Sequence, residues 1–316
     1  MDKQQTNNFQ HYVPRFLLDY FSDNVLLYIY DRNKKEYRSQ PPKRTAGEKA
    51  YYVFTDKGGE KNAELEKMFS VIEGAASSII RDIVSGKNEL SFEKKTELAL
   101  FIAALYLRVP ESLKRSEDMG KQMVKEVMSR TVMFEQYFQK TMDEIEKKEG
   151  KKISADMRKD IQATFRDKKY EVVFPKGYVL GTVLSNLMEI YKVMVQMEWI
   201  VIRAPKNKAF ISSDHPAFTF NPKPEGYWGS GIGLLALNCE TIAILTPKAA
   251  IYLSQKHNPE SVRFINGSSE LIDNFNFRAA IVSSRFVISH CEALLCKWVE
   301  RTKLSERGPY SRVKVG

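Results

Sequence analysis

The chain has three cysteines, Cys239, Cys291 and Cys296, and no CxxC pair among its 316 residues. An odd number of cysteines without paired spacing argues against a disulfide framework and against a zinc cluster. No apolar run approaches the roughly 18 residues that a membrane-spanning helix requires. The polar opening, residues 1–10, lacks the apolar centre of a secretory signal. We therefore expect a cytoplasmic protein that has no membrane partner.

Common catalytic motifs are also missing. No GxSxG elbow, P-loop, HExxH or GxGxxG motif occurs, which excludes the commonest named chemistries. The composition, 43% hydrophobic and 28% charged residues, is that of a globular chain with enough apolar material for a sizeable core.

Acidic residues are fewer than basic residues, 39 against 49, which gives a net charge of +10. Two short polar segments hold most of the excess: residues 32–49 have seven basic and two acidic residues, and residues 301–316 have five and one. Such segments can hold a phosphate backbone or an acidic partner, and they are also common as solubilising decoration.

Apolar periodicity predicts helices at residues 64–84, 92–108, 177–197 and 269–284. The second is apolar around much of its circumference, so Phe101 and Leu105 should be buried where it packs against the first. Residues 112–169 carry fifteen basic and eleven acidic residues, which indicates a charged helical hairpin broken near Gly150.

Short β-rich segments precede and follow the helices, at residues 25–31, 51–54, 199–202, 209–212, 241–245, 250–253 and 286–289. Strands, then helices, then strands predict an α+β fold, with a helical core and a mostly antiparallel sheet contributed by the N-terminal and C-terminal thirds. We expect one domain over residues 1–300, a charged helical insertion at about 112–170 and a basic tail at 301–316. The glycine-rich stretch 226–233 is predicted to be a loop.

The opening segment is the most informative part of the chain. Six large apolar residues lie in the twelve positions from Gln10, so this segment should dock on the body, and His11 and Arg15 should be held near the core. His11 could act as a general base, a metal ligand or an anion donor, and Arg15 could bind a carboxylate or phosphate. The alternative is a histidine bonded to backbone beside an arginine in a surface ion pair.

Three further candidates are polar groups on apolar or rigid elements. Glu73, with Glu66 seven residues before it, flanks the apolar stripe of the first long helix. Arg108 projects from an apolar helix face and must find an anion, either from another element or from a substrate. Asp214 follows a strand in the turn Ser-Asp-His-Pro at residues 213–216.

The chain resembles the domain-of-unknown-function family 4238, whose members open with His-x-Val-Pro-x-x-x-Leu-x-x-Phe. The resemblance rests on residues 11–21, Ile72-Glu73, Leu-Arg-Val-Pro at 107–110, the turn at 213–216, Leu-Thr-Pro at 245–247, and Asn274 or Asn276 before Arg285-Phe286. The family usually has Ser-Asp-Asn-Pro in that turn, so His215 departs from the pattern and is a poor candidate for an essential role. Membership implies a bacterial or related intracellular protein of unassigned biochemistry.

These observations favour a hydrolase of phosphodiester bonds in nucleic acid or a nucleotide. His11, Glu73, Arg108 and Asp214 are expected to converge on one cavity, with His11 as base or ligand, Glu73 and Asp214 as metal ligands or an acid–base pair, and Arg108 on a phosphate or oxyanion. Arg15 and Asn276 are expected to bind substrate. The sequence leaves open whether a divalent metal is bound. The alternative is a non-catalytic module that binds nucleic acid or protein, in which the same cluster is structural. A biological role as a toxin or phage-defence component would be compatible with either the hydrolase or the binding module.

Overall fold

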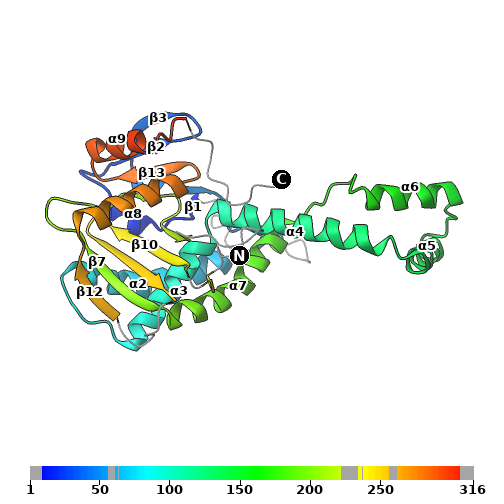
Figure 1. Cartoon of the computed structure of the whole chain (residues 1–316), viewed down its shortest axis with the longest axis horizontal. Coiled ribbons are helices and arrows are strands. Elements are labelled where there is room, and N and C mark those ends of the chain that lie inside the picture. Colours follow the sequence, from blue (N-terminus) through cyan, green and yellow to red (C-terminus); the bar gives the residue numbers. More distant parts are fainter. Residues whose placement is uncertain are drawn as a thin grey trace. The chain divides into compact units, whose positions relative to one another are not determined.

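The computed structural model describes residues 9–55, 61–62, 64–221, 234–236, 238–255 and 262–306. The chain divides into two compact units, one formed by Met1–Ser112 with Leu180–Gly316 and the other by Leu113–Val179. Figure 1 shows their helices and strands.

The helices are α1 (Arg15–Tyr20), α2 (Glu64–Val84), α3 (Phe92–Leu107), α4 (Pro110–Thr131), α5 (Glu135–Glu149), α6 (Ala155–Arg166), α7 (Lys176–Gln196), α8 (Ser269–Val282) and α9 (Glu292–Arg301), with a 3-10 turn at Pro42–Arg44. The strands are β1 (Phe9–His11), β2 (Leu27–Asp31), β3 (Glu36–Gln40), β4 (Gly47–Lys49), β5 (Phe54–Thr55), β6 (Lys61–Asn62), β7 (Glu198–Arg203), β8 (Ser212–Ser213), β9 (Ala217–Phe220), β10 (Glu240–Thr246), β11 (Ala249–Ser254), β12 (Val262–Asn266) and β13 (Phe286–Ser289).

The first unit contains two main sheets. One has the order β12-β7-β11-β10-β9, with β12 parallel to β7 and the other pairs antiparallel. The other, β3-β2-β13-β8, is antiparallel and joins N-terminal to C-terminal strands. The predicted α+β fold, with its sheets built from both ends of the chain, is confirmed.

Helices α2 and α3 pack against each other, side by side in Figure 1. Helix α3 begins at a proper N-cap, where the Ser91 hydroxyl accepts a hydrogen bond from the Lys94 amide at 3.3 Å. Phe101 and Leu105 on α3 are fully buried, as is Ile80 on α2. The predicted helical core is therefore present.

The opening segment docks as predicted. Strand β1 pairs antiparallel with β4, and the following apolar side chains are buried: Tyr12, Val13, Leu17, Leu18 and Phe21. Gly47 lies opposite His11, and a Cβ there would come within 2.5 Å of the Phe9 ring and 2.7 Å of the Gln10 carbonyl oxygen. A glycine at this position thus permits the close approach of β1.

The second unit, taken by itself, has a small apolar core. Its buried residues are Val132, Phe138 and Met142, with Ile153, Ile161 and Phe165 packed around them. Gly150 ends α5 in the left-handed region at φ 67°, as the sequence indicates. The predicted hairpin is wrong in detail, because the chain also breaks after Thr131 where Val132 turns into this core, giving three helices instead of two.

Several element boundaries differ from the predictions. The strand predicted at 51–54 is reduced to β5, because Ala50 (φ 53°) begins a turn that buries Tyr51 and Tyr52. The strand predicted at 209–212 pairs only in β8. Helix α9 was missed, and so were the short strands β1, β4, β6, β9 and β12. The stretch 226–233 and residues 307–316 of the predicted tail lie outside the described residues.

Part of the positive charge predicted to bind a partner is used inside the fold. Arg32 is buried, and its Nη1 donates to the Ser283 carbonyl; the Arg38 Nη2 lies 3.1 Å from the Asp31 carboxylate. Within the parts of the chain that the structure describes, no helix combines the length and apolarity needed to cross a membrane.

Candidate functional site

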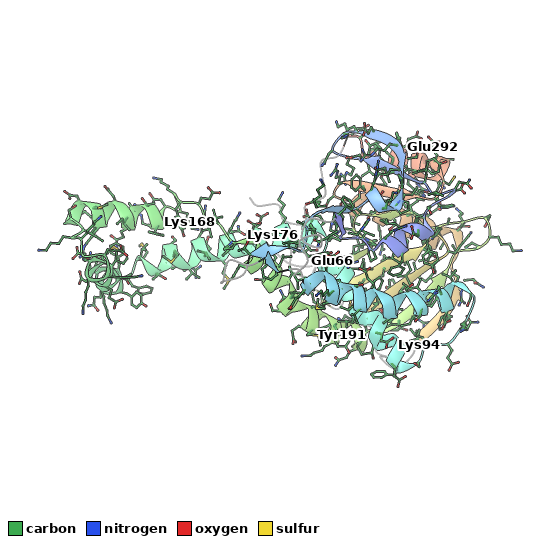
Figure 2. All side chains as sticks on the ribbon, turned by 180° about the vertical axis from the view of Figure 1, so that it is seen from behind. Glu66, Lys94, Lys168, Lys176, Tyr191 and Glu292 are labelled. Carbon is green, nitrogen blue, oxygen red and sulfur yellow. The ribbon has the colours of Figure 1, made fainter. Side chains whose placement is uncertain are left out.

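A cavity of about 190 Å³ opens where the docked N-terminal segment crosses α2. We call it the His11 cavity. It is lined by Phe9, Gln10, His11, Arg15, Tyr52, Glu66, Phe69, Ser70 and Glu73. The last four lie at three- and four-residue intervals from Glu66 on α2, so helix geometry places them on one face. Figure 2 labels Glu66 on this helix.

His11 lies at the end of β1 and is held from two sides. Its Nε2 is 3.2 Å from the Pro42 carbonyl oxygen, and its ring meets the Phe9 ring edge-on at 5.1 Å. A carbonyl oxygen can only accept a hydrogen bond, so Nε2 carries a proton, and in the neutral imidazole the lone pair is then on Nδ1.

Burial lowers the pKa of His11 below its usual 6.5. The Pro42 hydrogen bond and the charge of Glu73 oppose this shift, whereas Arg15 and Arg108 reinforce it. The imidazole is therefore neutral at pH 7, the form in which Nδ1 can accept a proton.

Arg108 and Glu73 form an ion pair, one of the outcomes that the sequence leaves open for Arg108. Arg108 Nη1 lies 2.7 Å from Glu73 Oε1, joining the end of α3 to α2. The Arg108 side chain is 2% exposed, that of Glu73 26%, and the guanidinium lies over the Phe69 ring at 5.2 Å. Arg108 Nε and Nη2 are buried without a hydrogen-bond partner in the described part of the chain. The pair is well fixed, but the guanidinium is not fully satisfied.

Gln10 and Tyr52 complete the wall and were missed in the sequence. Buried Gln10 donates from Nε2 to Glu66 Oε2 at 2.6 Å and accepts from the Tyr52 amide at 2.7 Å. The Tyr52 hydroxyl lies 3.1 Å from the His11 carbonyl oxygen. The one signal in the sequence that could have revealed Gln10 is its place in an apolar docking segment, because a buried side-chain amide must find hydrogen-bond partners.

Arg15 lines the same cavity from the first turn of α1. Its side chain is 62% exposed, and its contact with Asp19 is long, at 3.8 Å. A loose surface ion pair of this kind contributes little stability. The guanidinium can therefore turn to a ligand at low cost.

Asp214 does not line the His11 cavity, so the predicted convergence of four groups is wrong for this residue. Its carboxylate accepts hydrogen bonds from the amides of Ser284 (3.0 Å) and Arg285 (2.7 Å), in the segment between α8 and β13. Burial raises its pKa to about 6, outweighing these amide bonds. Asp214 pins the connection to β13, and the adjoining His215 is also buried in this region.

Asn276, predicted to bind substrate, also lies away from the His11 cavity. Its Oδ1 accepts from the Ile211 amide at 2.8 Å and its Nδ2 donates to the Ala209 carbonyl at 2.9 Å. It therefore satisfies the backbone of the segment that the sequence predicted as a strand. Asn276 instead borders a second cavity, described below.

The predictions left open whether a metal is bound. Among the residues whose placement is described, no group of three or more His, Cys, Asp or Glu side chains is arranged to hold a metal ion. The groups present in the His11 cavity fit proton transfer and anion binding instead.

Comparison with known proteins gives one result. The model of a family described as protein of unknown function (DUF4238) matches residues 10–293. Searches of curated proteins and of solved structures found no significant match. The family match includes the docked segment, α2, the end of α3 and the turn at Asp214, so the chain belongs to family DUF4238.

Proposed function

We propose that this protein is a hydrolase of phosphodiester bonds in nucleic acid or a nucleotide, and that His11 is its general base. The observation that carries the proposal is a neutral imidazole, fixed in one tautomer by the Pro42 carbonyl, in the same cavity as the Arg108-paired carboxylate of Glu73. Because burial lowers the pKa of His11 below its usual 6.5, the unprotonated imidazole is available as a base at neutral pH.

His11 Nδ1 would take the proton of the attacking hydroxyl, either a water or a ribose hydroxyl. The imidazolium that forms is favoured by the nearby charge of Glu73, which raises the pKa of His11. The buried Arg108 holds Glu73 in place for this role. Proton return from His11 to the departing oxygen would complete the exchange.

Arg15 would hold the phosphate at the cavity. Its exposed guanidinium can form paired hydrogen bonds to phosphate oxygens. The volume of about 190 Å³ is below that of a typical drug-sized ligand site. The cavity therefore suits the reacting phosphate and part of a sugar, with the rest of the substrate outside it.

One observation favours the second candidate, a non-catalytic binding module. Glu66 and Glu73 already have partners in Gln10 and Arg108, as expected of side chains that join β1, α2 and α3 for stability. In that case the cluster would be structural, and removing His11 would change no activity.

The test is a hydrolysis screen on single-stranded and double-stranded RNA and DNA and on nucleotides, with chelator and with added Mg²⁺ or Mn²⁺. We expect His11→Ala to lower turnover by about 100-fold or more while the fold persists. Arg15→Gln should raise KM, whereas Arg81→Gln, an exposed arginine on α2, serves as the matched control. Unchanged turnover in His11→Ala would favour the structural reading.

A further inference from the structure

A second cavity of about 340 Å³ lies in the first unit and shares no lining residue with the His11 cavity. We call it the lysine cavity. Its charged lining consists of Lys206, Lys208, Lys248, Lys297 and Asp273, with His290 beside them. These residues come from the segment after β7, the β10–β11 turn, α8, α9 and the position directly after β13. Four lysines from three separate parts of the sequence thus line one cavity.

The single carboxylate does not neutralise this charge. Asp273 lies 3.0 Å from Lys208 Nζ and 3.8 Å from Lys297 Nζ, and it also lies 3.4 Å from the Arg301 guanidinium. One negative charge is therefore shared by three cations. The cavity keeps a net positive charge, which attracts anions.

One of the four charges, that of Lys248, is held in place before any ligand arrives. Lys248 Nζ donates to the backbone carbonyls of Pro205 (3.2 Å), Lys206 (3.1 Å) and Lys208 (2.6 Å). These bonds fix both the ammonium and the segment that carries two other lysines. Asn276 fixes the next residues through the Ala209 carbonyl. A preorganised site of this kind lowers the entropic cost of binding.

His290 supplies a polar atom whose hydrogen-bonding capacity is not used within the described part of the protein. Its Nδ1 is buried without a hydrogen-bond partner within the described ranges. A buried polar atom left unpaired costs free energy that a ligand could recover. Because His290 lines the lysine cavity, a turn of its ring would bring this nitrogen to an anionic oxygen of a ligand bound there.

We propose that the lysine cavity binds a small phosphorylated molecule through its phosphate groups. Its volume falls within the usual range for small-molecule sites. The four lysines line one concavity, which favours a compact polyanion over an extended nucleic-acid backbone. This site goes beyond the proposed hydrolase and does not depend on catalysis at His11.

The test is calorimetric titration of the full chain with pyrophosphate, with inorganic phosphate and ATP as further arms. We expect saturable pyrophosphate binding that weakens by about tenfold or more in Lys206→Gln/Lys297→Gln. Both side chains are exposed enough for the variant to fold, and circular dichroism verifies this. Lys67→Gln/Lys192→Gln, which changes two exposed lysines on α2 and α7 and so removes the same two charges, should bind as the wild type does.

Comparing the titrations with pyrophosphate, inorganic phosphate and ATP shows which kind of phosphorylated molecule the cavity prefers. Tighter binding of ATP than of pyrophosphate indicates a nucleotide, and similar binding indicates that the phosphates alone are recognised. Retained binding in His11→Ala places the ligand away from the His11 cavity. Three results would overturn the proposal: no saturable binding, equal weakening in Lys67→Gln/Lys192→Gln, or tighter cavity-dependent binding of an RNA oligonucleotide than of any small phosphate.

Discussion

Breaking the Arg108–Glu73 pair from its two ends should give unequal losses of stability. Glu73→Gln leaves a guanidinium that is 2% exposed without its anion, whereas Arg108→Met leaves a carboxylate that is 26% exposed and can be hydrated. Removing one partner of a buried pair costs about 3–5 kcal/mol, and we expect Glu73→Gln to fall in this range.

Arg108→Met should cost less, about 1–3 kcal/mol. Methionine keeps much of the apolar contact with Phe69, and it removes Nε and Nη2, which are buried without partners. Both losses of unfolding free energy are measured by urea unfolding at pH 7, followed with a spectroscopic signal that comes from the first unit. The double variant Arg108→Met/Glu73→Gln should be more stable than Glu73→Gln alone. If Arg108→Met is the more damaging single change, the guanidinium is not buried as described and the reasoning fails.

Three further predictions concern other parts of the molecule. Burial raises the pKa of Asp214 to about 6 from its usual 3.8, so between these two pH values the folded state binds a proton that the unfolded state does not. The free energy of unfolding should therefore fall as the pH rises from 4 to 6.5, by on the order of 2–3 kcal/mol. This contribution should be missing in Asp214→Asn, as shown by urea unfolding of both proteins across that range; parallel pH curves would contradict it. Limited proteolysis should cut first in the second unit, near the connection between α5 and α6, because α6 has no fully buried residue. First cleavage in β10 or β11 would contradict this prediction. Phe138→Ala should loosen only the second unit, because its core is separate, so hydrogen exchange should rise in α5 and stay unchanged in α3.

The long helices could be predicted from sequence because their periodicity extends over many turns. The stripe of α2 and the nearly all-apolar α3 predict both their type and their burial. Helix α9 was missed because it is short and lies in a charged region, although Leu295, Trp298 and Val299 are buried. The strand predicted at 209–212 failed because its backbone is satisfied by the Asn276 side chain, a contact 65 residues away that no local pattern encodes.

The candidate site was predicted in part. His11, Arg15 and Glu73 line one cavity, and Arg108 pairs with Glu73, as the placement of polar groups on apolar elements suggests. Asp214 was misplaced because a buried carboxylate can be satisfied by backbone amides as well as by a cation. The lysine cavity could not be foreseen, since its lysines are spread over residues 206–297 and only the fold brings them together.

The most direct test of the account is the pH dependence of kcat/KM for phosphodiester cleavage, measured for the wild type and for His11→Ala. Burial lowers the pKa of His11 below 6.5, so the protonated, inactive imidazole should persist only at acid pH. The wild-type rate should rise through a step below pH 6.5 and reach a plateau by neutral pH. In His11→Ala the rate should be lower and the step should be gone. The same step in His11→Ala, at an undiminished rate, would contradict the assignment of His11 as the base.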